Sequence, residues 1–183
     1  MAIGVALIRG INVGSTRSLP MQVLRECCER VGMLDVRTYI QSGNVVFRWA
    51  GPGLASVAAK LEGEIEQAGG FRPAVVLRTR AELHMAVAAN PFAARAENEP
   101  AKLLVVYLQG KPSAGAGAAL DQVKRGNEQL RLVGREVFID FPDGVGKSKL
   151  SLAGVEKAVG VGTARNWNTT LKLLAMADEL DWA

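Results

Sequence analysis

The first half of the chain alternates between two hydrophobic patterns, and each pattern predicts one kind of element. Short runs rich in β-branched and aromatic residues indicate strands, at residues 3–9, 36–41, 44–49 and 73–79. Between these runs, apolar residues recur at spacings of three and four, which is typical of amphipathic helices, at residues 21–31 and 54–68. Pro20 precedes the first helix, where its missing N–H costs nothing, and glycine follows each helix.

The order of these elements, β-α-β-β-α-β, predicts a ferredoxin-like domain. In that fold an antiparallel sheet in strand order 4-1-3-2 carries two helices on one face. Ser42 and Gly43, between the second and third strands, suit a tight hairpin turn. We therefore expect an α/β protein of the α+β kind, with a ferredoxin-like first half.

The second half is less regular and predicts a smaller α/β domain with a β-hairpin and two C-terminal helices. Its predicted elements are a helix at 81–89, a strand at 102–108, a hairpin at 129–133 and 136–141, and helices at 148–159 and 168–180. Residues 112–119 are either a loop or the start of a helix that runs to residue 124. We place the boundary near residue 80, which gives domains 1–80 and 81–183.

The composition is that of an ordinary globular protein, with 49% hydrophobic and 22% charged residues in a chain of 183. No apolar run approaches the roughly 18 residues of a membrane span, and the apolar N-terminus is typical of a strand rather than a signal peptide. Cys27 and Cys28 are neighbours in a predicted helix, where their side chains diverge and do not suit a disulfide. We therefore expect a cytoplasmic protein without membrane contact, and the sequence leaves its oligomeric state open.

The residue content limits the candidate chemistry. His84 is the single histidine and lies in a predicted helix, so neither a zinc site nor a Ser-His-Asp or Cys-His arrangement is expected. We predict no metal and no cofactor. The net charge of +4 permits a phosphate-bearing partner without requiring one.

A glycine loop at residues 144–148 ends in Gly-Lys-Ser, as a P-loop does. A P-loop also needs a glycine where this chain has Phe141, and it follows a strand of a parallel sheet, so we do not assign a nucleoside triphosphatase. Two interpretations stay open. In the first, a first helical turn that carries Lys147, Ser148 and Lys149 binds an anion at its exposed N–H groups; in the second, Ser148 only caps the helix.

Polar residues follow the first two strands: Arg9 and Asn12 after the first, and Gln41, Ser42 and Asn44 after the second. A β-α-β crossover makes these strands parallel, so their carboxyl ends share one edge of the sheet. Arg72, before the fourth strand, is expected at that edge too. Such donors suit an anion or an oxygen-rich ligand. The alternative is that Gly and Asn only shape the turns.

A third polar group surrounds the start of the last predicted helix. It comprises Arg165, Asn166, Asn168 and Lys172. At a helix N-terminus these side chains would favour a negatively charged ligand. The alternative is a helix cap, with Trp167 packed beside it.

The segments LIRGINVG, YIQSGNVVF, NPF, SKLS and ARNWNTTLKLLAM occur in this order, and with them the chain resembles DUF1697, a family of uncharacterised bacterial proteins. The resemblance covers nearly the whole chain and implies a ferredoxin-like first half, a smaller α/β second half and no established activity. Lys147 lies outside the family's pattern. The resemblance also implies that motif positions are held by Arg9, Asn12, Gln41, Ser42, Asn44, Ser148, Lys149, Arg165, Asn166, Asn168 and Lys172.

Three functional hypotheses stay open. The chain binds a phosphate-bearing ligand, either a nucleic acid or a nucleotide, although an aromatic content of 5% speaks against base stacking. Alternatively, it is an enzyme that acts on a small anionic substrate, with Lys149 or a carboxylate in place of a histidine base. In the third hypothesis the motifs only shape the turns of an interaction or scaffold protein.

Overall fold

The computed structural model describes residues 1–14 and 16–182, which form two compact units. The first unit comprises residues 1–84 and the C-terminal segment from Lys172, and the second comprises residues 85–171. The division into domains 1–80 and 81–183 stays a prediction; the units divide the chain after His84 and assign the last helix from Lys172 onward to the first unit. None of the described helices is long and apolar enough to cross a membrane.

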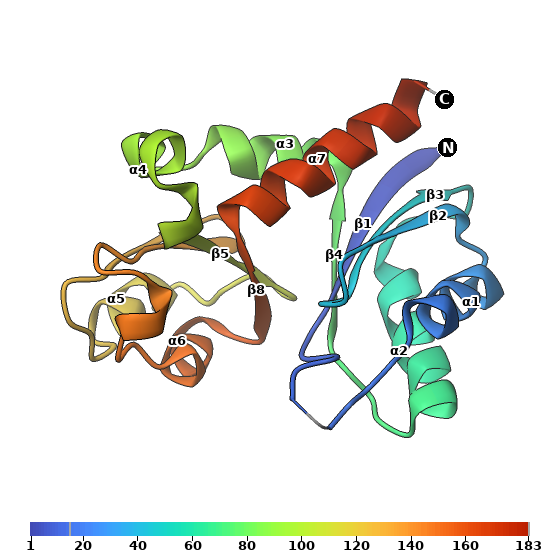
Figure 1. Cartoon of the computed structure of the whole chain (residues 1–183), viewed down its shortest axis with the longest axis horizontal. Coiled ribbons are helices and arrows are strands. Elements are labelled where there is room, and N and C mark those ends of the chain that lie inside the picture. The colour runs from blue at the N-terminus through green and yellow to red at the C-terminus, as the bar shows by residue number, and fades with distance from the viewer. Residues whose placement is uncertain (15, 183) are drawn as a thin grey trace. The chain divides into compact units, whose positions relative to one another are not determined.

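The first unit has the predicted ferredoxin-like topology (Figure 1). Its strands are β1 (Ala2–Ile8), β2 (Leu34–Tyr39), β3 (Asn44–Trp49) and β4 (Val75–Thr79), in the antiparallel order β2-β3-β1-β4. Helices α1 and α2 cover one face of the sheet and span Met21–Val31 and Ala55–Gly69. Both cysteines are buried in the core between these helices and the sheet.

The turn between β2 and β3 is longer than predicted. Tyr39 pairs with Asn44, so the loop comprises residues 40–43 rather than two residues. Ile40 and Gly43 both have positive φ, at 48° and 77°. A Cβ atom on Gly43 would lie 2.8 Å from the Ile11 side chain, so both the backbone conformation and the available space require glycine there.

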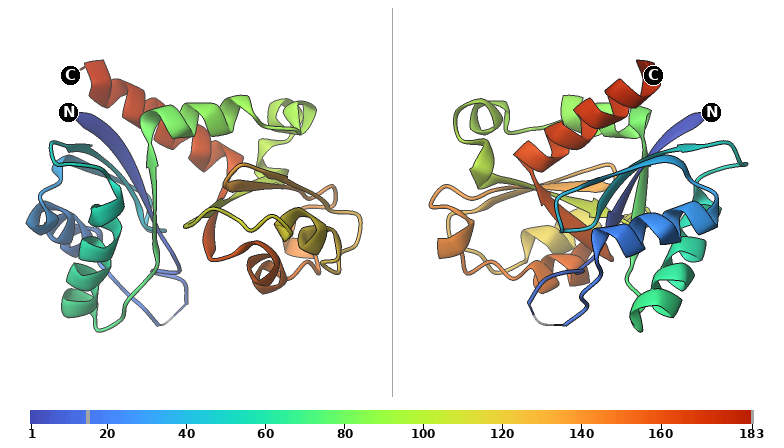
Figure 2. Two further views of the ribbon diagram at one scale, coloured as in Figure 1. Left: turned by 180° about the vertical axis from the view of Figure 1, so that it is seen from behind. Right: turned by 45° about the vertical axis from the view of Figure 1, so that its right-hand side comes forward.

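The second unit repeats the same order of elements (Figures 1 and 2). Its strands are β5 (Leu103–Leu108), β6 (Gln129–Val133), β7 (Glu136–Asp140) and β8 (Gly162–Asn166), in the antiparallel order β6-β7-β5-β8. Helices α5 and α6 pack against this sheet and span Ala116–Asp121 and Leu152–Val159. The remaining helices are α3 (Arg80–Ala88), α4 (Ala93–Asn98) and α7 (Trp167–Trp182), with 3-10 turns at Pro100–Lys102 and Val145–Lys147.

Two features of the second half differ from the sequence prediction. β8 was not predicted, because its five residues contain Gly, Arg and Asn and only one β-branched residue, Thr163. Helix α6 begins at Leu152 rather than at 148, because Ser151, and not Ser148, caps it by accepting a hydrogen bond from Gly154 N–H. Ser148 itself has extended backbone dihedrals.

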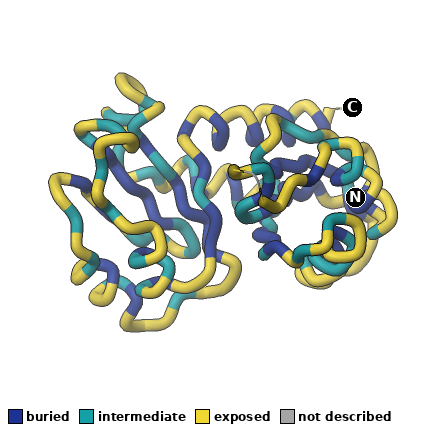
Figure 3. Tube along the Cα trace, turned by 60° about the horizontal axis from the view of Figure 1, so that its bottom comes forward, coloured by how far each residue is buried: buried dark blue, intermediate teal, exposed yellow. Residues whose placement is uncertain are grey.

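The repeat between the two units extends to single residues. Arg78 on β4 lies opposite Val5, and Arg165 on β8 lies opposite Val105 at the equivalent place. Each arginine is buried, and each donates from Nη1 to the carbonyl of the preceding residue at 2.8 Å. A helix follows each strand at once, α3 after β4 and α7 after β8. Figure 3 shows that the central strands of both units are buried.

The C-terminal part of α7 is held in the first unit by charged groups of α3. Asp178 Oδ1 accepts from Arg80 Nε at 2.6 Å and lies 2.8 Å from His84 Nε2. Arg80 Nη1 also donates to Asp181 at 2.7 Å. The hydrogen bond from Arg80 is the largest cause that lowers the pKa of Asp178 below its ordinary value.

We therefore predict that Asp178→Asn lowers the free energy of unfolding by about 1 kcal/mol at neutral pH, since the pair is partly exposed. A lowered pKa stabilises the fold above the unfolded-state pKa of about 3.9, and this contribution is lost as the pH falls. The difference between variant and wild type should therefore shrink below about pH 4 in urea titrations. Glu179→Gln, on the exposed side of the same helix, is the control; an equal loss in both variants would contradict the assignment.

Candidate functional site

The structure brings together the two loops that the topology places at one edge of the first sheet. Asn12 Nδ2 donates to the Gln41 carbonyl at 2.8 Å, and Ile8 N–H donates to the Gly43 carbonyl at 2.8 Å. The loop before β4 joins the same edge, because Arg9 N–H donates to the Ala74 carbonyl at 2.9 Å.

The two asparagines of this edge direct their amides at the backbone. Asn12 has a φ of 54°, and its side chain exchanges two hydrogen bonds with the backbone of Leu19, donating at 2.9 Å and accepting at 2.8 Å. Asn44 is fully buried and donates to the Tyr39 carbonyl at 3.1 Å and to Ser42 Oγ at 3.0 Å. These bonds hold the β1–α1 loop and the β2–β3 turn in shape.

The expectation that Arg72 joins this edge with its side chain is wrong. Its guanidinium turns back to α2, where Nη1 donates to Glu66 at 3.0 Å and Nη2 lies 3.5 Å from Glu62. Glu62 also accepts from Val75 N–H at 3.0 Å, so the carboxylates of α2 hold the loop that leads into β4.

The residues predicted around the last helix have separate roles. Arg165 lies in β8 rather than at a helix end, and its burial lowers the pKa of its guanidinium to about 10. Asn166 caps α7 by accepting from Thr169 N–H at 2.8 Å, as the alternative interpretation expects. Asn168 and Lys172 are exposed on α7.

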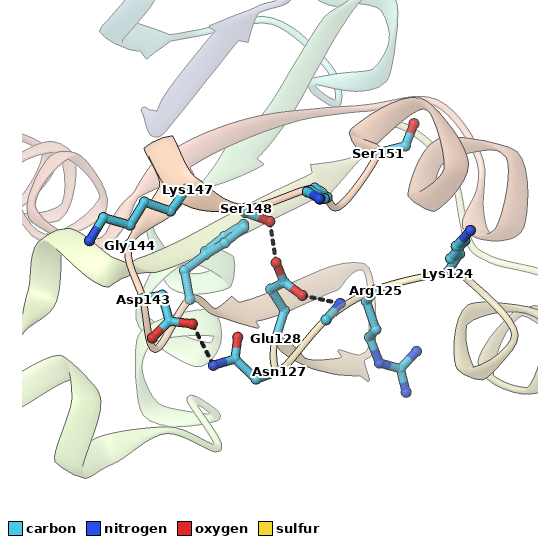
Figure 4. Close-up of a pocket in the computed structure, with 12 residues that line it drawn as sticks. Lys124, Arg125, Asn127, Glu128, Asp143, Gly144, Lys147, Ser148 and Ser151 are labelled. Carbon is cyan, nitrogen blue, oxygen red and sulfur yellow. Dashed lines mark hydrogen bonds between the residues drawn. The ribbon is translucent and has the colours of Figure 1, made fainter.

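A cavity of about 460 Å³ lies within the second unit, between the loop that precedes β6 and the loop that follows β7 (Figure 4). Its lining includes the predicted residues Ser148 and Lys149. The other lining residues are Lys124, Arg125, Gly126, Asn127, Glu128, Phe141, Asp143, Gly144, Lys147 and Ser151.

Glu128 ties the two loops of the cavity together. Its carboxylate accepts from the Ser148 hydroxyl and, at 2.7 Å, from Gly126 N–H, and Figure 4 shows both bonds. Ser148 Oγ in turn accepts from Leu150 N–H at 3.0 Å. The bond from Ser148 is the largest cause that lowers the pKa of Glu128 below its ordinary value. A second link joins Asn127 to Asp143 at 2.7 Å.

The basic side chains of the cavity outnumber its two acidic ones. Within residues 1–14 and 16–182, Lys124, Lys147 and Lys149 take part in no ion pair. Arg125 donates from Nη1 to carbonyls at the end of α5, the nearest at 3.2 Å. Carboxylates of the described residues therefore do not match the charge of these three ammonium groups.

The cavity exists because two connections of the second unit are long. Residues 122–128 and 142–151 correspond to residues 32–33 and 50–54 of the first unit. By strand register, Phe141 is the equivalent of Trp49. In the first unit the Trp49 ring closes this end of the sheet, and a Cβ atom on Gly51 would lie 2.6 Å from it.

The glycine loop at residues 144–148 lines the cavity, but it does not have the structure of a P-loop. Residues Val145–Lys147 form a 3-10 turn after β7, and β7 pairs with antiparallel neighbours on both sides. The α-helix starts only at Leu152, so Lys147 does not lie in its first turn. Among the described residues, no group of three or more His, Cys, Asp or Glu side chains could hold a metal ion.

A second cavity of about 430 Å³ in the same unit offers less to a charged ligand. Its single basic residue, Arg95, donates to Asp140 at 2.5 Å and to Glu99. The charge of its guanidinium is therefore already matched by protein carboxylates.

The fold and the site define a class of protein, in which one chain holds two ferredoxin-like units and the second unit carries a basic cavity. The family model described as "Protein of unknown function (DUF1697)" matches residues 1–138, and the chain belongs to this family. The resemblance seen in the sequence motifs is thereby confirmed.

One solved structure shares this fold along almost its whole length. It is a conserved bacterial protein from Streptococcus pneumoniae, with 23% sequence identity and a TM-score of 0.72. The similarity covers 96% of this chain and 98% of that chain. No curated protein matches this chain.

The bonds of Asn12 predict a large effect on stability. Asn12→Ala removes three hydrogen bonds and places a Cβ-bearing residue without a polar side chain at positive φ, so we expect a loss of about 3 kcal/mol in the free energy of unfolding. Asn12→Gly relieves the backbone strain and should lose about 1 kcal/mol less. Val13→Ala, at a neighbouring exposed position, should leave the urea midpoint unchanged. Three equal midpoints would show that Asn12 does not hold the loop.

Proposed function

We propose that the cavity of the second unit binds a small ligand that carries a phosphate group, as a nucleotide does. The observation that supports this function best is the set of lysine ammonium groups without carboxylate partners, Lys124, Lys147 and Lys149, around one cavity. Lysine is a common phosphate ligand in proteins, acting as a compact point charge. Ser148 and Asn127 add groups that can donate or accept hydrogen bonds.

The size of the cavity supports a small ligand rather than a nucleic acid. Its volume of about 460 Å³ falls within the range typical of small-molecule sites. Nucleic-acid surfaces usually add exposed aromatic rings on which bases stack, whereas the aromatic residue that lines this cavity, Phe141, is only 3% exposed.

Catalysis is a second candidate, because the Ser148 hydroxyl donates to the Glu128 carboxylate as a nucleophile would donate to a base. The lowered pKa of Glu128 makes this carboxylate a weak base at neutral pH. Binding is therefore the better supported function. A scaffold role is supported where motif residues bond to the backbone, as Asn12 and Asn44 do in the first unit and Asn166, the cap of α7, does in the second.

The edge of the first sheet remains a further candidate for an anion site. Arg9 is half-buried and Gln41 is exposed, and their loops meet there. Arg9→Ala separates the two roles: lost binding of a phosphate-bearing probe at an unchanged melting temperature indicates a ligand contact, whereas a lowered melting temperature indicates a structural role.

The lysines of the cavity can be tested directly. We predict that the double variant Lys147→Ala, Lys149→Ala binds AMP at least about tenfold more weakly than the wild type in calorimetric titrations, since each charge-assisted hydrogen bond contributes about 1.5–3 kcal/mol. Lys157→Ala, which removes an exposed charge from α6 outside the cavity, is the matched control and should bind as the wild type does. Because the control removes one charge and the double variant two, a loss in binding free energy for Lys157→Ala of about half that of the double variant would mean that only net charge matters.

The choice between a small ligand and a nucleic acid needs a separate measurement. A nucleic-acid surface would give gel shifts with short RNA or DNA that weaken steeply with salt, because each phosphate contact releases counterions. We expect no shift at tens of micromolar protein in low salt. A salt-sensitive shift that the lysine double variant abolishes would instead assign the cavity rim to nucleic acid.

A further inference from the structure

Glu128 is the most buried of the charged residues that line the cavity of the second unit. Glu128 is 7% exposed, whereas Lys124, Lys147 and Lys149 are exposed. Figure 4 shows the Glu128 carboxylate between Ser148 and the backbone of residue 126, with the amino groups of Lys124 and Lys147 on opposite sides of it. A ligand that enters from the rim therefore meets the three lysines and Asp143, whose carboxylate accepts from Asn127, before it reaches Glu128.

The carboxylate restricts which part of a ligand can lie beside it. Hydrogen bonds, chiefly from Ser148, hold the pKa of Glu128 below its ordinary value, so the group stays ionised at neutral pH. A phosphate oxygen next to it would meet a like charge in a partly desolvated place. A hydroxyl group would not, because a carboxylate offers about four acceptor positions and Ser148 and Gly126 occupy only part of them.

We propose that Glu128 is the specificity-determining residue of this cavity, and that it selects ligands with a hydroxyl group as well as a phosphate group, such as phosphorylated sugars and nucleotides. The hydroxyl donates to Glu128, the phosphate meets Lys147 and Lys149, and Phe141 supplies an apolar wall. This inference rests on the proposed phosphate-binding function of the same cavity. Dinucleotide sites in other folds use a similar arrangement. There an acidic side chain accepts a hydrogen bond from a ribose hydroxyl, and the phosphates bind at a separate place.

Probes that differ only in their hydroxyl groups test the proposal on the full chain without any variant. In calorimetric titrations we expect AMP to bind at least about tenfold more tightly than 2′,3′-dideoxy-AMP, the effect of one hydrogen bond to a charged group. Ribose 5-phosphate, which keeps the hydroxyl groups and the phosphate without the base, should bind the wild type as well.

The variant Glu128→Gln adds a readout that poor folding cannot imitate. It keeps the size of the side chain and removes its charge, so the preference for AMP over 2′,3′-dideoxy-AMP should disappear. Pyrophosphate should bind the variant more tightly than the wild type, because the repulsion is gone. A partly unfolded variant would weaken both probes together, and an unchanged preference for AMP in a folded variant would overturn the role of Glu128.

The failures of the two proposals are distinguishable. If AMP and 2′,3′-dideoxy-AMP bind the wild type equally, and the lysine double variant loses both, the role of Glu128 is overturned and the phosphate site stands. If AMP, 2′,3′-dideoxy-AMP, ribose 5-phosphate and pyrophosphate all fail to bind the wild type, the phosphate-binding function is overturned, and the role of Glu128 with it.

Discussion

Antiparallel pairing of both neighbours with one central strand is the constraint on which each unit depends. With β1 or β5 between two antiparallel partners, every connection must leave the sheet at one of its two ends. Additional residues can then be inserted only in those connections, because the core between the sheet and the helices has no room for them. The first unit is extended after β1, in residues 9–20, and the second is extended at the opposite end, in residues 122–128 and 142–151.

The extended connections of the two units are stabilised by different bonds, and only those of the second unit enclose the cavity described above. In the long loop of the first unit, the Asn12 side chain bonds to the backbone of Leu19 in the same loop and of Gln41 in the β2–β3 turn. The loops of the second unit are joined by the carboxylate of Glu128 and leave a cavity between them. Where the first unit fills the equivalent place with Trp49, the second has the smaller Phe141 and exposed lysines. A similar scaffold can thus be closed in one unit and open to a ligand in the other.

The sequence predicted the parts of the fold that local periodicity specifies. It gave no signal for β8, since Gly162–Asn166 lacks a run of β-branched residues, although a second β-α-β-β-α-β series would have required a strand there. The predicted topology correctly placed the loops of Asn12 and Gln41 side by side. It did not indicate that the Asn12 side-chain amide donates to the backbone. Ser148 and Lys149 could be singled out from the glycine loop. Lys124 and Glu128 were not singled out, although the predicted hairpin at 129–133 and 136–141 already places the residues before its first strand beside those after its second.

Backbone amide chemical shifts of a ¹⁵N-labelled full-length chain, recorded while AMP is added, test the central claim most directly. We expect the shifts to change chiefly at Gly126, Gly144 and residues 147–149, which line the cavity. Changes confined to the loops of Arg9 and Gln41, or no change at saturating AMP, would contradict it.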